Sequence, residues 1–145
     1  MADAPEVVQV ADAVVAALNA GTFSQTVAAI RAYLPQFELP EMAVLHVTVV
    51  PKSVEISGAC RNAAAYDYKV DVAVQKRFQE ATAAELDPLL RLVEEIADHF
   101  RLRRLPAYPA AAWIKTEHTA LYAPEHMESL RQFTSVLTLT FRVFR

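Results

Sequence analysis

The 145-residue sequence has two glycines and one cysteine, and both shortages exclude kinds of site. Two glycines leave little room for the glycine-rich loops that cradle phosphate groups. Cys60 cannot form a disulfide within the chain, and no second cysteine stands at the spacing of a zinc motif. A reducing, cytoplasmic setting is therefore the simplest expectation.

Excess positive charge and long apolar runs are also missing. Fourteen Lys and Arg against 17 Asp and Glu give a formal net charge of -3, whereas a domain that grips nucleic-acid phosphates is usually basic. No uncharged apolar run reaches about 18 residues, and no basic leader precedes an apolar stretch at the N-terminus. We therefore expect no nucleic-acid reader, no membrane span and no export signal.

Apolar residues are abundant, at 54% of a chain whose length suits one domain over residues 1–145. Two segments have helical spacing. The first runs from Glu6 to Asn19 and stops before Gly21, and the second carries an apolar stripe from Leu86 to Phe100 with charged residues behind it. Thr82 and Glu85 would suit a capping box, while the Asp-Pro pair that follows suits a later start, and we favour a start near Glu85.

Five segments predict strands, so the predicted order is one helix, three strands, one helix and two strands. They are residues 27–38 (an edge strand bent at its proline), Val44–Pro51 with "SVEIS" after a kink at Pro51 and Lys52, Tyr66–Lys76, "AWIKTEHTALY", and Phe133–Phe144. In the Tyr66–Lys76 strand, the side that carries Asp67 and Gln75 is predicted to be wet. The last strand alternates with period two, and it must pair on at least one side.

No catalytic or metal-binding constellation survives inspection. His118 and His126 each stand beside a glutamate, but eight residues across a strand and a turn match no compact metal motif. Asp67 and Asp71 would lie roughly 13 Å apart on one strand face, too far for a general acid and base. Cys60 has no flanking signature of a nucleophile. We therefore expect no enzyme, no cofactor and no metal.

Two segments suit contacts instead. "SGACRNAAA", residues 57–65, has small side chains and no apolar anchor, so we predict a loop that is mobile in the isolated subunit and joins the two strands of a long hairpin. Arg101, Arg103 and Arg104 follow the second helix. They would stabilise the negative end of its dipole or dock onto an acidic partner, and both interpretations stay open.

The order of these elements resembles the tail-terminator, or tail-completion, family of long-tailed bacteriophages, to which minor tail protein U belongs. "EVVQVADAVVAALNA" is similar to the opening helix, "LHVTVVPKSVEI" and "YDYKVDVAVQKRF" to the long hairpin, and "ELDPLLRLVEEIADHF" to the second helix. "AWIKTEH" and "FTSVLTLTFRVF" are similar to the final strand pair. The resemblance covers nearly the whole chain, and "HVTVVP" and "FTSVLTLTFRV" are its most telling pieces.

The resemblance implies a single α+β domain with a mainly antiparallel or mixed sheet of four to five strands, both helices packing on one face, and the final strand pairing with "AWIKTEH". It implies a structural virion protein of the tail or neck, assembled in the host cytoplasm. Copies of the chain, expected to number six, would form a ring that caps the tail tube and meets the head-completion or connector protein. DNA would pass through the lumen without specific binding, which suits the negative charge. No cofactor is implied.

On this interpretation the interface would include both contact segments. Its expected residues are Ser57, Gly58, Ala59, Cys60, Arg61, Asn62, Arg101, Arg103 and Arg104. The loop of residues 57–65 would become ordered on assembly, because contacts that close a ring need a projecting element that meets a different surface.

Two other functions fit the same element order. One is a head–tail adaptor or another ring component of the neck. The other, from a different class, is a small cytoplasmic protein or enzyme that binds a hydrophobic ligand beneath Tyr66, Tyr68, Trp113 and Tyr122. Convergent buried polar groups in a pocket would mark the second alternative.

Overall fold

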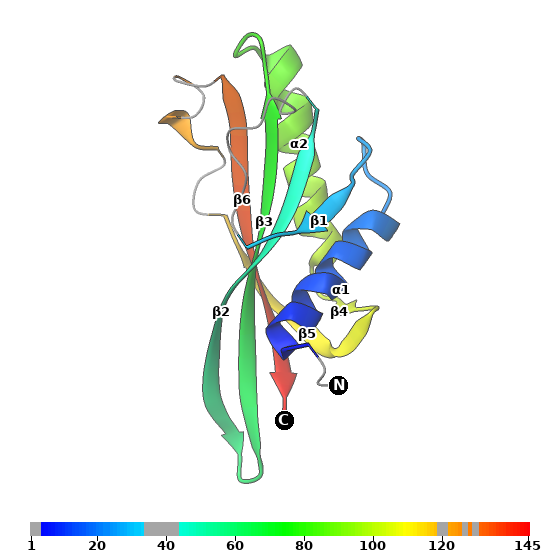
Figure 1. Cartoon of the computed structure of the whole chain (residues 1–145), viewed down its shortest axis with the longest axis vertical. Coiled ribbons are helices and arrows are strands. Elements are labelled where there is room, and N and C mark those ends of the chain that lie inside the picture. The colour runs from blue at the N-terminus through cyan, green and yellow to red at the C-terminus, as the bar shows by residue number, and fades with distance from the viewer. Residues whose placement is uncertain (1–3, 34–43, 119–121, 126–127, 129–130) are drawn as a thin grey trace.

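In the part of the chain that the structure describes, two helices and six strands are defined (Figure 1). They are α1 (Glu6–Ala20), β1 (Ala29–Arg31), β2 (His46–Cys60), β3 (Ala63–Arg77), α2 (Ala83–Phe100), β4 (Arg104–Leu105), β5 (Tyr108–Glu117) and β6 (Gln132–Phe144). The structure is a computed structural model, and it describes residues 4–33, 44–118, 122–125, 128 and 131–145. The fold is α+β, as predicted, and α1 ends within one residue of its predicted limit.

The six strands form one mixed sheet in the order β1-β2-β3-β6-β5-β4. Among the pairs of these described strands, β1–β2 is parallel and the other four are antiparallel. The predicted sheet of four to five strands lacks one strand, β4. β4 has two residues, which are too few to show a periodic pattern in the sequence. Of the edge strand predicted over residues 27–38, the structure has the three residues of β1. Residues 34–38 of that prediction lie outside the described residues. The predicted pairing of β5 with β6 is confirmed, and β6 also pairs with β3, so both of its edges are covered.

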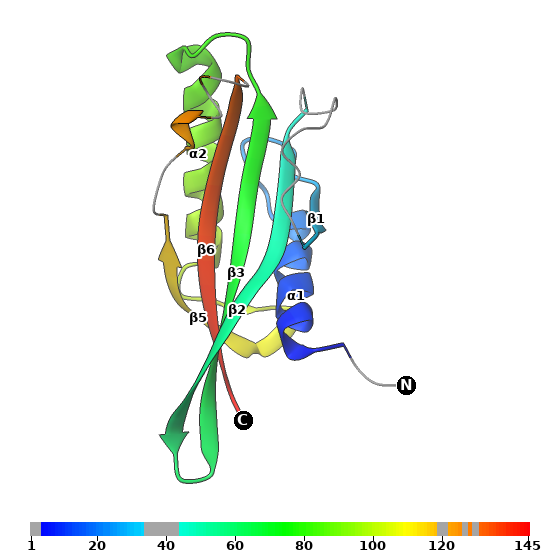
Figure 2. The ribbon, with the colours of Figure 1, turned by 60° about the vertical axis from the view of Figure 1, so that its left-hand side comes forward.

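One face of the sheet carries both helices and the hydrophobic core (Figure 2). α1 buries Val10, Val14 and Leu18, one side of the helix at spacings of four. α2 buries Leu89, Leu92, Val93, Ile96 and Phe100. Alternate residues of β6 meet them, because Leu137, Leu139 and Phe141 are at most 1% exposed and the Phe100 and Phe141 rings meet edge to face. The period-two pattern predicted for the last strand is confirmed, and it places these three side chains in the core.

α2 begins at Ala83, two residues before the predicted start. Thr82 occupies the cap position without a side-chain capping bond. Instead, the Glu85 carboxylate accepts hydrogen bonds from the backbone N–H groups of Gln79 and Glu80, at 2.9 and 3.3 Å. A carboxylate in the first turn suits the positive end of the helix dipole, which favours the earlier start.

The sheet face opposite the helices is less wet than predicted. Asp67, Lys69 and Asp71 of β3 are half-buried, but Ala73 and Gln75 on the same side are buried. The amide group of Gln75 has no hydrogen-bond partner. β3 lies between β2 and β6, so side chains from two neighbouring strands cover its short residues, which an alternating pattern cannot report.

Candidate interaction surface

The β2–β3 hairpin projects beyond both helices as an arm (Figure 1). We define the arm as Lys52–Cys60 of β2, the turn at Arg61 and Asn62, and Ala63–Tyr68 of β3. Val47–Val50 of β2 are buried, whereas all nine residues of Lys52–Cys60 are exposed. A single strand therefore passes from core to solvent near Pro51.

The prediction that residues 57–65 form a loop was wrong, because most of them belong to strands. β2 continues to Cys60 and β3 begins at Ala63, so the turn itself consists of two residues. Ser57 pairs with Ala65, and Gly58 pairs with Ala64. Small side chains leave the segment without an apolar anchor, but the backbone ladder needs none. The predicted interface residues from Ser57 to Asn62 are all exposed, and their ordering on assembly stays a prediction.

A bulge marks the base of the arm. The β2–β3 register shifts between Pro51 and Ser53, so Lys52 is an extra residue. This confirms the kink that the sequence predicts there. A bulge bends its strand and increases the local twist. The hairpin accordingly twists as it leaves the core, as Figures 1 and 2 both show.

The two faces of the arm differ in chemistry. Val54 and Ile56 continue the helix-bearing face beyond the helices, and they are 45% and 57% exposed. Beside them, the Tyr66 ring lies under the guanidinium of Arg145, 4.2 Å from the ring centre. The period-two spacing of "SVEIS" predicts that these two side chains share a face, but it does not report that the face is bare.

A charge pair lies on the opposite face of the arm base. Arg142 of β6 donates two hydrogen bonds to the Asp67 carboxylate, at 2.7 and 2.9 Å. Hydrogen bonding to Arg142 holds the pKa of Asp67 below its ordinary value, although burial opposes that shift. The arm therefore has one apolar face and one charged face.

A polar cluster fixes the base of the arm to the rest of the molecule. The Glu6 carboxylate, at the start of α1, accepts hydrogen bonds from the Tyr68 hydroxyl at 2.6 Å and from the Tyr108 hydroxyl, and it pairs with Arg145 Nε at 3.3 Å. We call these four residues the Glu6 cluster. They come from α1, β3, β5 and the residue after β6, so no spacing rule in the sequence joins them.

The Glu6 cluster shifts the protonation of its members. Burial acts to raise the pKa of Glu6, but the hydrogen bonds from Tyr108 and Tyr68 and the charge of Arg145 together lower it. Burial, with the hydrogen bond to Glu6, raises the pKa of Tyr68 to about 12. At neutral pH the cluster is therefore a carboxylate bound by two neutral tyrosines and a cation.

The three predicted arginines form a separate surface. Arg101 is the residue that caps the C-terminal end of α2, and Leu102 then turns the chain with a φ of 59°. The Arg103 carbonyl accepts a hydrogen bond from the Trp113 N–H at 3.0 Å, and the Arg104 side chain donates to the Pro109 carbonyl at 3.1 Å. All three arginines are exposed in the segment between α2 and β5, which Figure 1 shows away from the tip of the arm. The structure does not bring the two predicted contact segments together.

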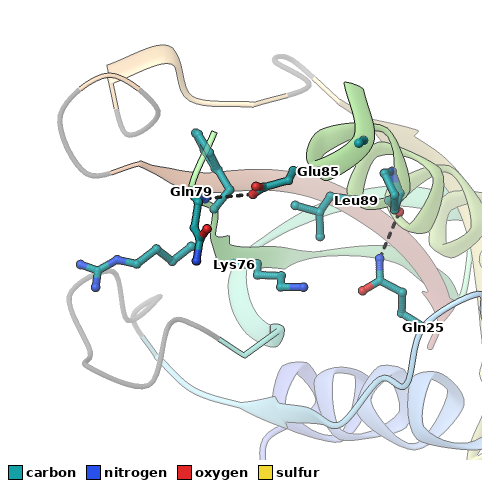
Figure 3. A pocket seen from close by; sticks show the side chains of 9 residues that line it. Gln25, Lys76, Gln79, Glu85 and Leu89 are labelled. Carbon is teal, nitrogen blue, oxygen red and sulfur yellow. Dashed lines mark hydrogen bonds between the residues drawn. The ribbon is translucent and has the colours of Figure 1, made fainter. Parts of the chain in front are cut away.

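A shallow hollow of about 410 Å³ lies between the end of β3 and the start of α2, away from the arm (Figure 3). Gln25, Lys76, Gln79, Glu85 and Leu89 are among its lining residues. Two hydrogen bonds join lining residues to one another (Figure 3): Glu85 accepts from the Gln79 backbone N–H, and the Gln25 amide donates to the Pro88 carbonyl at 3.2 Å.

The aromatic residues of the ligand-binding alternative do not line this hollow. Tyr68 is buried and bonded to Glu6, and Tyr66 stacks near it, with ring centres 6.2 Å apart. The Trp113 indole donates to the Thr116 hydroxyl at 2.9 Å, and Tyr122 is partly exposed. Tyr66, Tyr68 and Trp113 therefore lie in strands of the sheet, whereas Tyr122 lies outside them.

The rejected metal and acid–base candidates have partners of their own. His118 Nε2 lies 2.8 Å from the Ser135 hydroxyl, and His126 lies outside the described residues. Asp71 accepts a hydrogen bond from the Thr138 hydroxyl at 2.7 Å. Within the described part of the chain, no three His, Cys, Asp or Glu side chains gather as a metal site, and no helix there is long and apolar enough to cross a membrane.

Neither a protein-family model nor a curated protein matches the sequence. Among solved structures, the chain is similar to the sheath/tube terminator, in its extended state, of PVC, an extracellular contractile injection system studied by cryo-EM. The TM-score is 0.47 and the sequence identity is 15% over 99% of this chain. The match spans 58% of the length of that terminator.

Proposed function

We propose that this protein is a structural subunit that caps the tube of a phage-type tail as a ring and joins the tail to the head connector. The sequence resemblance to tail terminators supports the proposal through the order of helix, hairpin, helix and final strand pair. The observation that carries it is the arm, whose nine exposed β2 residues project beyond the helices. A ring closed by head-to-tail contacts needs an element that reaches from one copy to a different surface of the next.

The ring would contain six copies and would meet the tube protein on one side and the head-completion or connector protein on the other. DNA would pass through its lumen without specific binding, and the net charge of -3 supports this because an anionic wall does not retain phosphates. The protein would act in the virion tail or neck after assembly in the host cytoplasm. We propose no catalytic activity, no cofactor and no metal.

The three arginines that follow α2 form the second contact surface in the proposal. Arg101, Arg103 and Arg104 are exposed apart from the arm, so one copy offers two different contact regions. Replacing all three by alanine should weaken assembly while leaving the thermal melting temperature nearly unchanged, if they serve docking. A lowered melting temperature with normal assembly would assign them to stabilising the end of α2 instead.

The test mixes the purified protein with tubes assembled from recombinant tail-tube protein. Electron microscopy should show a ring of density at one end of each tube, and tubes should stop growing when the protein is present. Bovine serum albumin at equal mass concentration is the control for nonspecific effects. Binding to purified head connector without any binding to tubes would favour the head–tail adaptor instead, and failure to bind either assembly would contradict the proposal.

A further inference from the structure

The outer edge of the arm is a long strand edge without a partner in the described residues. β1 pairs with Val47–Val49 of β2, and β3 occupies the other side of β2. Among the residues that the structure describes, no strand lies on the other side of Lys52–Cys60, and this segment contains no proline. Proteins normally protect such edges, because open N–H and C=O groups recruit another strand.

The backbone groups that face solvent can be identified. Ala64 exchanges two backbone hydrogen bonds with Arg145, at 2.8 and 3.0 Å, so its N–H and C=O point away from β2. Along an antiparallel strand, the backbone N–H and C=O groups of successive residues point alternately to one side and the other. Those of Tyr66 and Tyr68 therefore point away from β2, as those of Ala64 do. The residues opposite these three on β2 are Gly58, Ile56 and Val54. The N–H and C=O groups of Val54, Ile56 and Gly58 therefore point outward from the sheet.

We propose that the arms of two copies of this chain pair along this edge as antiparallel strands around a twofold axis. The first argument is length, since no other open strand edge among the described residues matches it. β1 has three residues and β4 has two, and β4 covers the first part of β5. Among the strand edges that the structure describes, a second copy of this nine-residue edge is the one that matches it in length.

The second argument is register. Centring the pair on Ile56 places it opposite its counterpart, with Val54 opposite Gly58 and Glu55 opposite Ser57. The three outward residues of each copy then form about six hydrogen bonds across the axis. The exposed Val54 and Ile56 side chains of both copies gather on one face. A register centred on Glu55 would instead oppose two carboxylates, which is unfavourable.

The third argument is access. Figures 1 and 2 both show the arm beyond the ends of α1 and α2, so a second arm can approach without meeting a helix. The pairing concerns the free protein and does not rest on the proposed ring. It would protect the edge until the arm meets its partners in an assembly.

Gly58 provides a matched pair of variants. A Cβ at Gly58 would have no atom within 4 Å, so Gly58→Ala keeps the N–H and adds no clash. Gly58→Pro removes an N–H that points outward, a position where edge strands tolerate proline. Sedimentation equilibrium of the purified protein, under reducing conditions and without tubes, should show a dimer for the wild type and Gly58→Ala. The dissociation constant should rise about tenfold or more for Gly58→Pro.

Cysteine crosslinking gives an independent readout of register. In a Cys60→Ser background, Ile56→Cys should form a disulfide-linked dimer on oxidation, because the two thiols meet at the axis. Val54→Cys should not, because the two copies of residue 54 lie four positions apart along the strands, roughly 13 Å. A wild-type protein that stays monomeric at all concentrations, Gly58→Pro dimers as tight as wild type, or equal crosslinking at both positions would each overturn the proposal.

Discussion

β2 passes through two environments, and the contrast between them organises the molecule. From Val47 to Val50 its side chains are buried, whereas from Lys52 to Cys60 every residue is exposed. Apolar residues alternate in both halves, because Val47 and Val49 face the helices and Val54 and Ile56 continue the same face. Alternation therefore shows which face a side chain joins, and only the packed helices decide whether that face becomes core.

The largest effect is expected when one charge is placed on the helix-bearing face of the sheet, first in the core and then in the arm. Leu139→Asp puts a carboxylate into the core at a site with 0% exposure, and it should lower the free energy of unfolding by more than about 4 kcal/mol or prevent folding. Val54→Asp, in the arm, should change it by less than about 0.5 kcal/mol. Chemical denaturation measures both, and similar losses would show that the arm belongs to the core.

The Glu6 cluster connects the two regions, so breaking it should have an intermediate effect. Glu6→Gln removes the charge that binds two tyrosine hydroxyls and Arg145, and it should lower the free energy of unfolding at pH 7 by about 1–3 kcal/mol. Glu94→Gln on the exposed side of α2 is the control and should have little effect.

This loss should depend on pH in a defined direction. The pKa of Glu6 in the folded protein is lower than its ordinary value of 4.5. The stabilisation is therefore fully present above about pH 4.5, and it disappears as the pH falls through the folded-state pKa. Denaturation of wild type and Glu6→Gln across pH 7 to 3 checks this, and a difference that grows on acidification would contradict the assignment.

The smallest effect should come from the charged face of the arm base. Asp67→Asn removes the carboxylate that binds Arg142, a pair that water partly reaches. We expect a small decrease in melting temperature at low salt, and a smaller one at high salt because ions screen the pair. Calorimetry at two salt concentrations measures it, and a decrease that is independent of salt would indicate a packing role.

The sequence allowed accurate prediction where one element carries its own pattern. The helical stripe of α1, the proline kink in β2 and the alternation of β6 each lie within one segment, and the structure has all three. The Glu6 cluster could not be predicted, because Glu6 and Tyr108 are 102 positions apart. The extension of β2 through Gly58 to Cys60 was missed because small residues suggest a loop, whereas backbone pairing with β3 makes it a strand.

Shortening the arm tests the central claim most directly, that the arm serves assembly and the helix-covered sheet serves stability. Replacing Gly58–Ala64 by Asn-Gly leaves Ser57 opposite Ala65 across a two-residue turn of a favourable type. The measurement is end-capping of tail tubes by electron microscopy, alongside thermal melting of the same preparation. We predict a nearly unchanged melting temperature with loss of rings and caps. Normal rings and normal capping by the shortened protein would contradict the claim.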